Sequence, residues 1–249
     1  MKTDQRCTPA GSERAHPADG VGLALPPTAP RTGEGSGTVT TTTPATFVTN
    51  GVEVRPLAVS GCYEFTPRVF RDERGLFVSP LRQDALTEVL GHPFPIAQTN
   101  HSRSARGVMR GVHFSATPPG QAKYVHCSRG RGLDVVVDIR LGSPTFGAWD
   151  TVEMDTETFR AAYLPDGVGH AFLSLEDDTV MTYLVSTPYR ADLEREIDPL
   201  DPALGLPWPK DMRFTFSQRD TRSMSLALAE AEGILPRFED CLALAKAHR

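Results

Sequence analysis

Short apolar runs separated by turn-forming residues fill the chain from Phe47 to about Phe216. Gly, Pro, Asp and Asn interrupt these runs every few residues, which is typical of many strands joined by turns. The clearest strand is predicted at 133–140, where apolar and polar residues alternate. One face of this strand carries Leu133, Val135, Val137 and Ile139, and the other carries Asp134, Asp138 and Arg140.

The rest of the pattern predicts more strands and few helices. Further strands are predicted at 123–127, 160–164, 171–175 and 179–185. A helix is predicted at 83–90, and strong helix formers follow at 225–232 and 237–247, with Gly233 and Pro236 between them. Because strands and helices do not alternate along the chain, we expect an all-β domain, a β-sandwich or barrel with C-terminal helices.

Composition divides the chain into three parts. Residues 1–46 contain no aromatic residue and are rich in Gly, Pro, Ser and Thr. Such a segment cannot bury enough apolar area to offset the entropy lost on ordering. We therefore expect a disordered N-terminal tail over 1–46, the main domain over 47–220 and a C-terminal helical extension over 221–249.

Charge and cysteine content exclude several classes of protein. The 249-residue chain has a formal net charge of -5 at pH 7, which excludes a protein that holds nucleic acid by bulk positive charge. No stretch approaches the ~20 apolar residues of a membrane span, and the N-terminus lacks the apolar core of a secretory signal. We expect a cytoplasmic protein with no nucleic-acid or membrane partner. The four cysteines lack CxxC spacing, which indicates reduced thiols.

Polar residues that could act on a substrate gather first at 98–102, 110–113 and 121–123. These segments offer two histidines, an arginine and a lysine. His101 has the neighbours of a surface turn residue. His113 is flanked by apolar residues, so on spacing alone it could equally be a buried structural histidine.

A second group follows the glycine-rich turn 165–169, which places His170 at the start of a predicted strand. Tyr183 lies in the next predicted strand. Taken alone, Tyr183 and His126 are ordinary strand residues. Taken together, His, Tyr, Lys and Arg side chains are the groups needed to move protons beside an anionic ligand.

A catalytic metal is not expected. Metal-binding cupin barrels use an HxH pair, a Glu and a later His, but here Phe114 and Ser115 follow His113. No other closely spaced set of two histidines and a carboxylate replaces this pair. GxSxG, P-loop and GxGxxG motifs are also absent from the sequence.

Several motifs in the same order resemble one family. They lie at 70–77, 98–102, 107–113, 121–123, 134–147, 165–172 and 189–194. Together they resemble the dTDP-4-dehydrorhamnose 3,5-epimerase family, metal-free cupin-like enzymes that act on nucleotide-linked 4-keto-6-deoxyhexoses. The resemblance covers about Val54 to Asp220, and the segment 108–119 looks closest to the branch that makes deoxysugars for antibiotics. It implies a cupin-type jelly-roll fold.

The resemblance also implies roles for individual residues. His113 would be the general base, oriented by Asp220, and Tyr183 would be the acid on the opposite face of the sugar. Arg110 and Lys123 would lie at the sugar and its C4 oxygen. The nucleotide and diphosphate pocket would be lined by Arg74, Gln98, Asn100, His170, Glu194 and Arg219.

Two positions depart from the family pattern. Ser79 stands where the family usually has a carboxylate, which affects a thymine or ribose contact, and Ser115 stands in place of a glutamine, which affects sugar contacts. The resemblance further implies a homodimer. In it, the stretch 52–55 and the motif 70–77 would complete the partner's pocket, and Arg74 would reach the neighbouring nucleotide.

The expected reaction inverts C3, C5 or both of a dTDP-4-keto-6-deoxyhexose. A fixed cation such as Lys123 stabilises the enolate, imidazole takes the proton, and tyrosine returns one from the other face. The substrate's own ketone accepts the electrons, so no cofactor is needed. A 3,4-ketoisomerase of the same substrates and a non-catalytic sugar-nucleotide-binding module are the alternatives. A base and an acid on opposed faces favour inversion.

Overall fold

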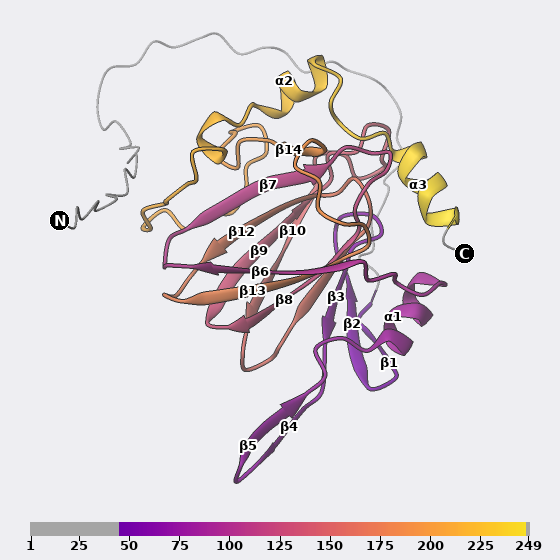
Figure 1. Ribbon diagram of the computed structural model, residues 1–249, viewed down its shortest axis with the longest axis vertical. Coiled ribbons are helices and arrows are strands. Elements are labelled where there is room, and N and C mark those ends of the chain that lie inside the picture. Colours follow the sequence, from indigo (N-terminus) through magenta and orange to yellow (C-terminus); the bar gives the residue numbers. More distant parts are fainter. Residues whose placement is uncertain (1–44, 248–249) are drawn as a thin grey trace, which may run out of the picture. The chain divides into compact units, whose positions relative to one another are not determined.

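The computed structural model describes residues 45–247, which form two antiparallel sheets packed face to face (Figure 1). The seven-stranded sheet contains, in spatial order, β1 (Phe47–Thr49), β2 (Val52–Pro56), β3 (Tyr63–Thr66), β11 (Ala161–Leu164), β8 (Lys123–Arg129), β13 (Thr179–Val185) and β6 (Gln98–Ser104). The five-stranded sheet contains β10 (Trp149–Asp155), β9 (Arg131–Val137), β12 (Gly169–Ser174), β7 (Met109–Ser115) and β14 (Glu194–Glu196). This arrangement confirms the predicted all-β jelly roll.

Within residues 45–247, three helices and a short 3₁₀ turn accompany the sheets. They are α1 (Gln83–Leu90), η1 (Asp220–Arg222), α2 (Leu226–Ala231) and α3 (Phe238–Ala247). The predicted helix 83–90 and strand 179–185 match α1 and β13 at both ends. The Ser225 hydroxyl accepts a hydrogen bond from the Leu228 amide and so caps α2, at the point where the composition predicts a helix.

The space between the sheets holds an apolar core at one end. Val125 and Cys127 from β8 and Met181 from β13 pack there against Val136 and Phe172 from the opposite sheet. These side chains are almost completely inaccessible to solvent. Because the core fills only part of the interior, the other end leaves room for polar side chains.

The outer faces of both sheets are also covered. Leu86 on α1 is fully buried with Phe65 and Tyr124 of the seven-stranded sheet, which stabilises the fold by about 2 kcal/mol relative to an exposed leucine. Ala229 on α2 and Leu235 belong to the apolar cluster on the outer face of the five-stranded sheet.

The C-terminal segment is tied to the barrel by a buried cation. Arg140 is 2% exposed, forms an ion pair of 2.8 Å with Asp138, and lies 4.9 Å from the centre of the Phe238 ring on α3. Backbone hydrogen bonds join Leu141 to Pro236 and Phe238. The segment after 220, predicted as an extension, therefore packs as part of the same core.

The strand predicted at 133–140 is observed as β9 at 131–137, and the structure shows where its polar face lies. β9 ends at Val137, and its polar face points to the interior of the barrel rather than to solvent, since Asp134 and Val136 are both fully buried. Strands buried on both faces occur when each face of the sheet is covered.

The pattern of apolar and polar residues does not predict several strands, because these strands are polar or exposed. β6 reads Gln-Thr-Asn-His-Ser-Arg-Ser and lies at an edge of its sheet. β4 (Val69–Asp72) and β5 (Gly75–Val78) form a separate hairpin that projects from the sandwich (Figure 1). Of the predicted tail 1–46, all but residues 45 and 46 lies outside the described residues.

Candidate active site

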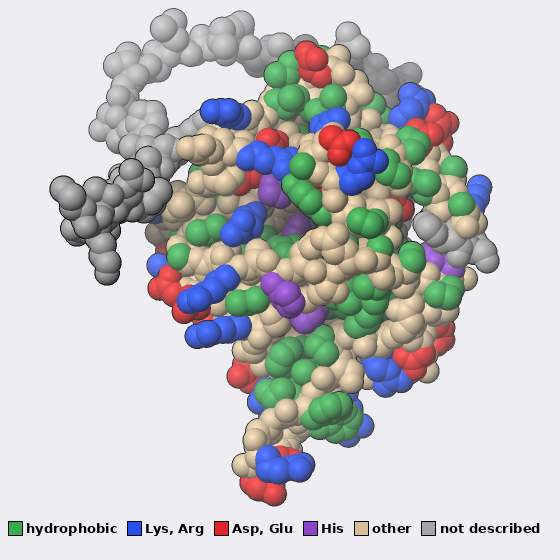
Figure 2. All heavy atoms as spheres, viewed as in Figure 1, with side chains coloured by type: hydrophobic (Ala, Val, Ile, Leu, Met, Phe, Trp, Pro, Cys, Tyr) green, Lys and Arg blue, Asp and Glu red, His purple; other side chains and the backbone are tan. Residues whose placement is uncertain are grey.

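A cavity of about 220 Å³ lies between the two sheets at the polar end of the barrel. Figure 2 shows a hollow with histidine side chains inside it and Lys and Arg side chains around it. Seven of the predicted site residues line the cavity: Asn100, Arg110, His113, Lys123, His170, Tyr183 and Glu194. They come from six different strands, and the fold brings them together.

A β-bulge places Arg110 and His113 on the same face of β7. Strict alternation would put these two residues on opposite faces, because three positions separate them. In the pairing with β12, however, Arg110 lies opposite Phe172 and His113 opposite His170, so β7 carries one extra residue. Gly111 absorbs the extra residue at a φ of 112°, in a region that favours glycine.

His113 and Asp220 form a hydrogen-bonded pair. Nε2 of His113 donates to Oδ1 of Asp220 at 2.6 Å, and the Ser217 hydroxyl donates to the other carboxylate oxygen at 2.6 Å. The Asp220 side chain is 3% exposed. Burial alone would raise the pKa of Asp220, but the hydrogen bonds from His113 and Ser217 outweigh it and lower the pKa below its usual range.

Tyr183 faces this pair from the opposite sheet. Its hydroxyl lies 3.4 Å from the Ser102 hydroxyl, and its ring meets the His170 ring edge to face at 5.9 Å. Burial raises the pKa of Tyr183 to about 12, so the phenol is protonated at neutral pH.

Lys123 is the buried cation of the cavity. Its side chain projects from β8 into the same interior as Tyr183, and it is 8% exposed. Burial lowers the pKa of Lys123, while the carboxylates of Glu194 and Asp134 act in the opposite direction. A cation held in such surroundings is suited to stabilising an anion that forms nearby.

A second histidine and carboxylate pair lies deeper in the barrel. Nε2 of His170 contacts Oδ2 of Asp134 at 2.5 Å, and both side chains are buried. Oδ1 of Asp134 is buried without a hydrogen bond. Sequence reasoning missed Asp134 as a site residue. Its place on the polar face of the best predicted strand was the signal that could have found it.

The remaining predicted residues lie near the cavity mouth. Gln98 donates to Asn100 at 2.5 Å and accepts from the Tyr189 amide at 3.0 Å. Ser115 donates to Glu194 at 2.7 Å. Tyr189, which the sequence analysis did not single out, lines the mouth and is 50% exposed.

Arg219 is next to the His113 and Asp220 pair in the chain and forms an ion pair with Glu196. Burial alone would lower the pKa of Arg219, but the carboxylates of Glu196 and Glu194 outweigh it and raise the pKa above its usual value. Glu196 is a further residue that sequence reasoning missed.

Arg74 is not among the residues that the fold brings to this cavity. It lies on the β4–β5 hairpin, where it pairs with Asp72, and its side chain is 83% exposed. His101 and His126 both lie opposite Thr182 in the sheet, on the face away from the Tyr183 side chain, although His101 still borders the cavity.

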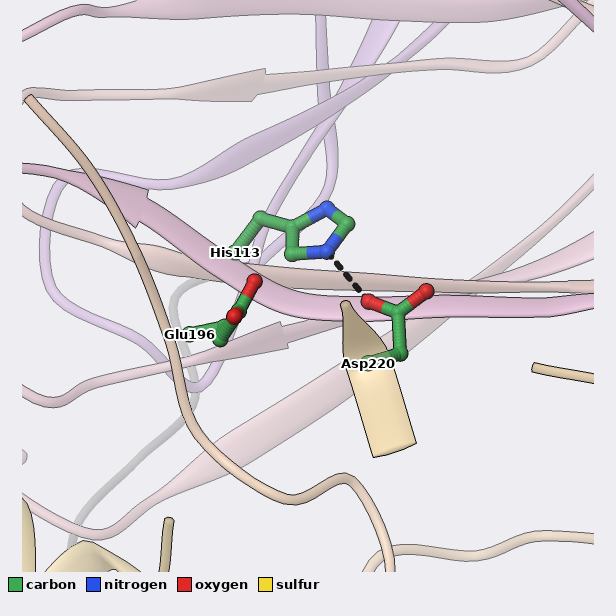
Figure 3. Close-up of side chains that lie close together, drawn as sticks. All are labelled: His113, Glu196 and Asp220. Carbon is green, nitrogen blue, oxygen red and sulfur yellow. Dashed lines mark hydrogen bonds and ion pairs between the residues drawn. The ribbon is translucent and has the colours of Figure 1, made fainter. Parts of the chain in front are cut away.

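Three possible metal ligands, His113, Glu196 and Asp220, have donor atoms within 4.8 Å of one another (Figure 3). These atoms already have partners, since Nε2 of His113 binds Asp220 and Glu196 pairs with Arg219. The hydrogen bond between His113 and Asp220 orients the imidazole, as a proton-transfer site requires.

Comparisons with known proteins agree with this geometry. A sequence model of the dTDP-4-dehydrorhamnose 3,5-epimerase family matches residues 56–227. A dTDP-4-dehydrorhamnose 3,5-epimerase of Mycolicibacterium smegmatis is 48% identical over 195 residues, which cover 78% of this chain and 96% of that protein.

Solved structures of Streptomyces proteins are similar too. ChmJ, a 3'-monoepimerase from Streptomyces bikiniensis in complex with dTDP-quinovose, superposes with a TM-score of 0.76 at 45% identity and covers 78% of this chain and 98% of its own. NovW, a 4-keto-6-deoxy sugar epimerase from the novobiocin gene cluster of Streptomyces spheroides, has a TM-score of 0.74 at 43% identity, with coverage of 78% and 98%. With the family model and the relatives in agreement, this chain belongs to the dTDP-4-dehydrorhamnose 3,5-epimerase family.

Proposed function

We propose that this epimerase inverts C3, C5 or both of a dTDP-4-keto-6-deoxyhexose in deoxysugar biosynthesis. One observation carries the proposal: His113 and Tyr183 enter a single cavity from opposite sheets, with the buried cation Lys123 beside them. Inversion needs a base and an acid on opposite faces of one carbon. A 3,4-ketoisomerase could move its protons on one face, so the opposed pair favours inversion.

In the proposed reaction, His113 removes the proton from the carbon next to the C4 ketone. Asp220 holds Nε2, which leaves Nδ1 to accept the proton and stabilises the imidazolium that forms. The C–H electron pair moves into the new carbon–carbon double bond, and the ketone becomes an enolate whose oxygen is stabilised by Lys123. Tyr183 then donates its proton to the opposite face of the carbon, and the ketone returns. The ketone accepts the electrons, so the step requires no metal or organic cofactor.

The mouth of the cavity offers contacts for the nucleotide. Arg219 supplies positive charge for the diphosphate, and Gln98, Asn100 and Glu194 supply hydrogen-bonding groups. The exposed ring of Tyr189 offers a stacking surface for the base. Ser115, bonded to Glu194, shapes the sugar end of the pocket.

Proton NMR in deuterium oxide with dTDP-4-keto-6-deoxyglucose tests the function. We expect the wild type to exchange and invert a proton next to the ketone. The variant His113→Asn should lose exchange at every sugar carbon and still bind dTDP, because the base is gone while the nucleotide contacts remain. Near-normal turnover in that variant would refute the assignment. A protein that binds the sugar nucleotide without exchange would be the non-catalytic module.

We also propose that the working unit is a homodimer. The β4–β5 hairpin exposes Phe70 and Phe77, which are 51% and 68% exposed, and it carries Arg74. Ligand pockets usually enclose roughly 300–1,000 Å³. The cavity of about 220 Å³ is smaller, so a further wall would be needed to enclose a sugar nucleotide. A hairpin from the partner would supply that wall and bring Arg74 to the nucleotide. β2 pairs with β1 and β3 of its own chain, so the hairpin is the better candidate for exchange than 52–55.

For the location of the protein, we propose the cytoplasm. Among the described residues, Cys62, Cys127 and Cys241 are unpaired and buried, as is usual where thiols stay reduced. No helix in the described part of the chain is both long and apolar enough to cross a membrane.

A further inference from the structure

Glu196 is a second carboxylate beside the general base. It lies on β14 directly opposite His113 of β7, so the two side chains share the face that borders the cavity. Figure 3 shows the Glu196 carboxylate next to the hydrogen-bonded pair of His113 and Asp220. The three groups have polar atoms within 4.8 Å of one another, and the Glu196 side chain is 18% exposed.

Arg219 joins this group through its ion pair with Glu196. The charged and titratable groups around His113 are Arg110 on β7, Lys123 on β8, Asp134 on β9, His170 on β12, Tyr183 on β13, Glu194 and Glu196 on β14, and Arg219 and Asp220 at η1. Of these, Glu196 and Asp220 each have a carboxylate oxygen within 4.8 Å of an imidazole nitrogen of His113.

The charges of this group create a conflict that Glu196 resolves. A guanidinium at the mouth attracts a diphosphate, but an unpaired cation near an imidazole disfavours the protonated form that a general base must reach. Glu196 pairs with Arg219 and neutralises it, so within the group of Arg219, Glu196, Asp220 and neutral His113 the negative charge of Asp220 is left over. That charge is cancelled when His113 takes a proton from the substrate.

We propose that Glu196 is a positioning residue that neutralises Arg219, so that the cation needed for the diphosphate does not weaken His113 as a base. Asp220 orients the imidazole. Because Glu196 neutralises Arg219, the negative charge of Asp220 remains to stabilise the imidazolium of His113. This inference rests on the proposed epimerase function and adds an electrostatic link between nucleotide binding and proton abstraction.

A double-variant cycle tests the link. Deuterium exchange into dTDP-4-keto-6-deoxyglucose at saturating substrate is measured against pH for wild type, Glu196→Gln, Arg219→Gln and the variant with both changes, and dTDP affinity is measured by calorimetry. Glu196→Gln should lower the exchange rate at neutral pH about tenfold and move the acidic limb of the profile to lower pH. Arg219→Gln should weaken dTDP binding and move the limb to higher pH.

The variant with both changes is the decisive one. In this variant, the acidic limb of the pH profile and most of the exchange rate should return to wild-type values, because one positive and one negative charge have been removed together. Binding of dTDP should stay weak. A slow double variant, or an unchanged limb in Glu196→Gln, would overturn the role of Glu196. Glu196→Asp keeps the charge and should keep the wild-type profile; the same loss as Glu196→Gln would also overturn the proposal.

Glu153→Gln is the matched control. Glu153 pairs with Arg131 at 2.9 Å on the sheet, away from the cavity, and its loss should change neither rate nor affinity. If the wild type itself exchanges no proton, the epimerase function fails. If the wild type exchanges and Glu196→Gln behaves like it, only the inference about Glu196 fails.

Discussion

At the scale of single residues, the hydroxyl of Tyr183 separates exchange from inversion. Tyr183→Phe removes one oxygen and keeps the ring against His170. His113 should still remove and return a proton on its own face, so deuterium still enters the sugar. Inverted product should fall by the ~10²- to 10⁴-fold expected when a general acid is lost. Both quantities are read from one NMR sample, and normal inversion would show that another group is the acid.

Asp220 links the same site to acid stability. Its pKa is lowered in the folded state by hydrogen bonds from His113 and Ser217 that outweigh burial. A lowered carboxyl pKa contributes stability above the unfolded pKa, and this contribution is lost as the pH falls through the folded value. The difference in urea midpoint between wild type and Asp220→Asn should therefore shrink from about pH 5 to about pH 3. A difference that stays constant over this range would contradict the linkage.

At the scale of elements, the bulge in β7 decides whether Arg110 and His113 meet. A Cβ at Gly111 would lie 2.5 Å from the His170 carbonyl oxygen and 2.7 Å from the Ala171 Cα, at a φ that side chains rarely adopt. Gly111→Ala should lower the unfolding free energy by at least about 2 kcal/mol. It should also lower the exchange rate below that of wild type, because His113 would be misplaced.

Gly142→Ala provides the comparison for that change. Gly142 has a φ of 82°, and a Cβ added there would meet no atom within 4 Å, so only backbone strain of about 1 kcal/mol is added. Urea unfolding and NMR exchange of the two variants measure the effect. Equal losses in both would show that strain alone, rather than contact with β12, makes Gly111 necessary.

At the scale of the whole molecule, the hairpin β4–β5 should control assembly. Phe70 and Phe77 lie opposite each other on the hairpin and form an exposed apolar pair. Light scattering at micromolar concentration should give twice the chain mass of 27.1 kDa for wild type. Phe77→Asp should give the mass of one chain, because a charge is costly to bury in an apolar contact.

Leu242→Asp, at an exposed apolar position on α3, should remain dimeric and serves as the control. In the monomeric variant, dTDP should bind more weakly, because the partner's hairpin no longer closes the pocket. A monomeric wild type would refute both the dimer and the role of Arg74.

Elements whose information is local could be predicted from the amino-acid sequence. The apolar run at 179–185 predicted β13, and the strong helix formers at 225–232 predicted α2, since these signals lie within a few neighbouring residues. The candidate residues His113, Lys123 and Tyr183 were also found from residue type and spacing, while their roles came from the family resemblance.

Which residues far apart in the sequence come into contact is decided only by the tertiary structure. Asp220 meets His113 across 107 positions, and Glu196 reaches the same imidazole because β14 pairs with β7. Asp134 has a polar partner inside the barrel because both faces of β9 are covered. Strand pairing and bulges depend on packing between segments far apart in the chain, and a local pattern of apolar and polar residues holds no information about which segments will meet.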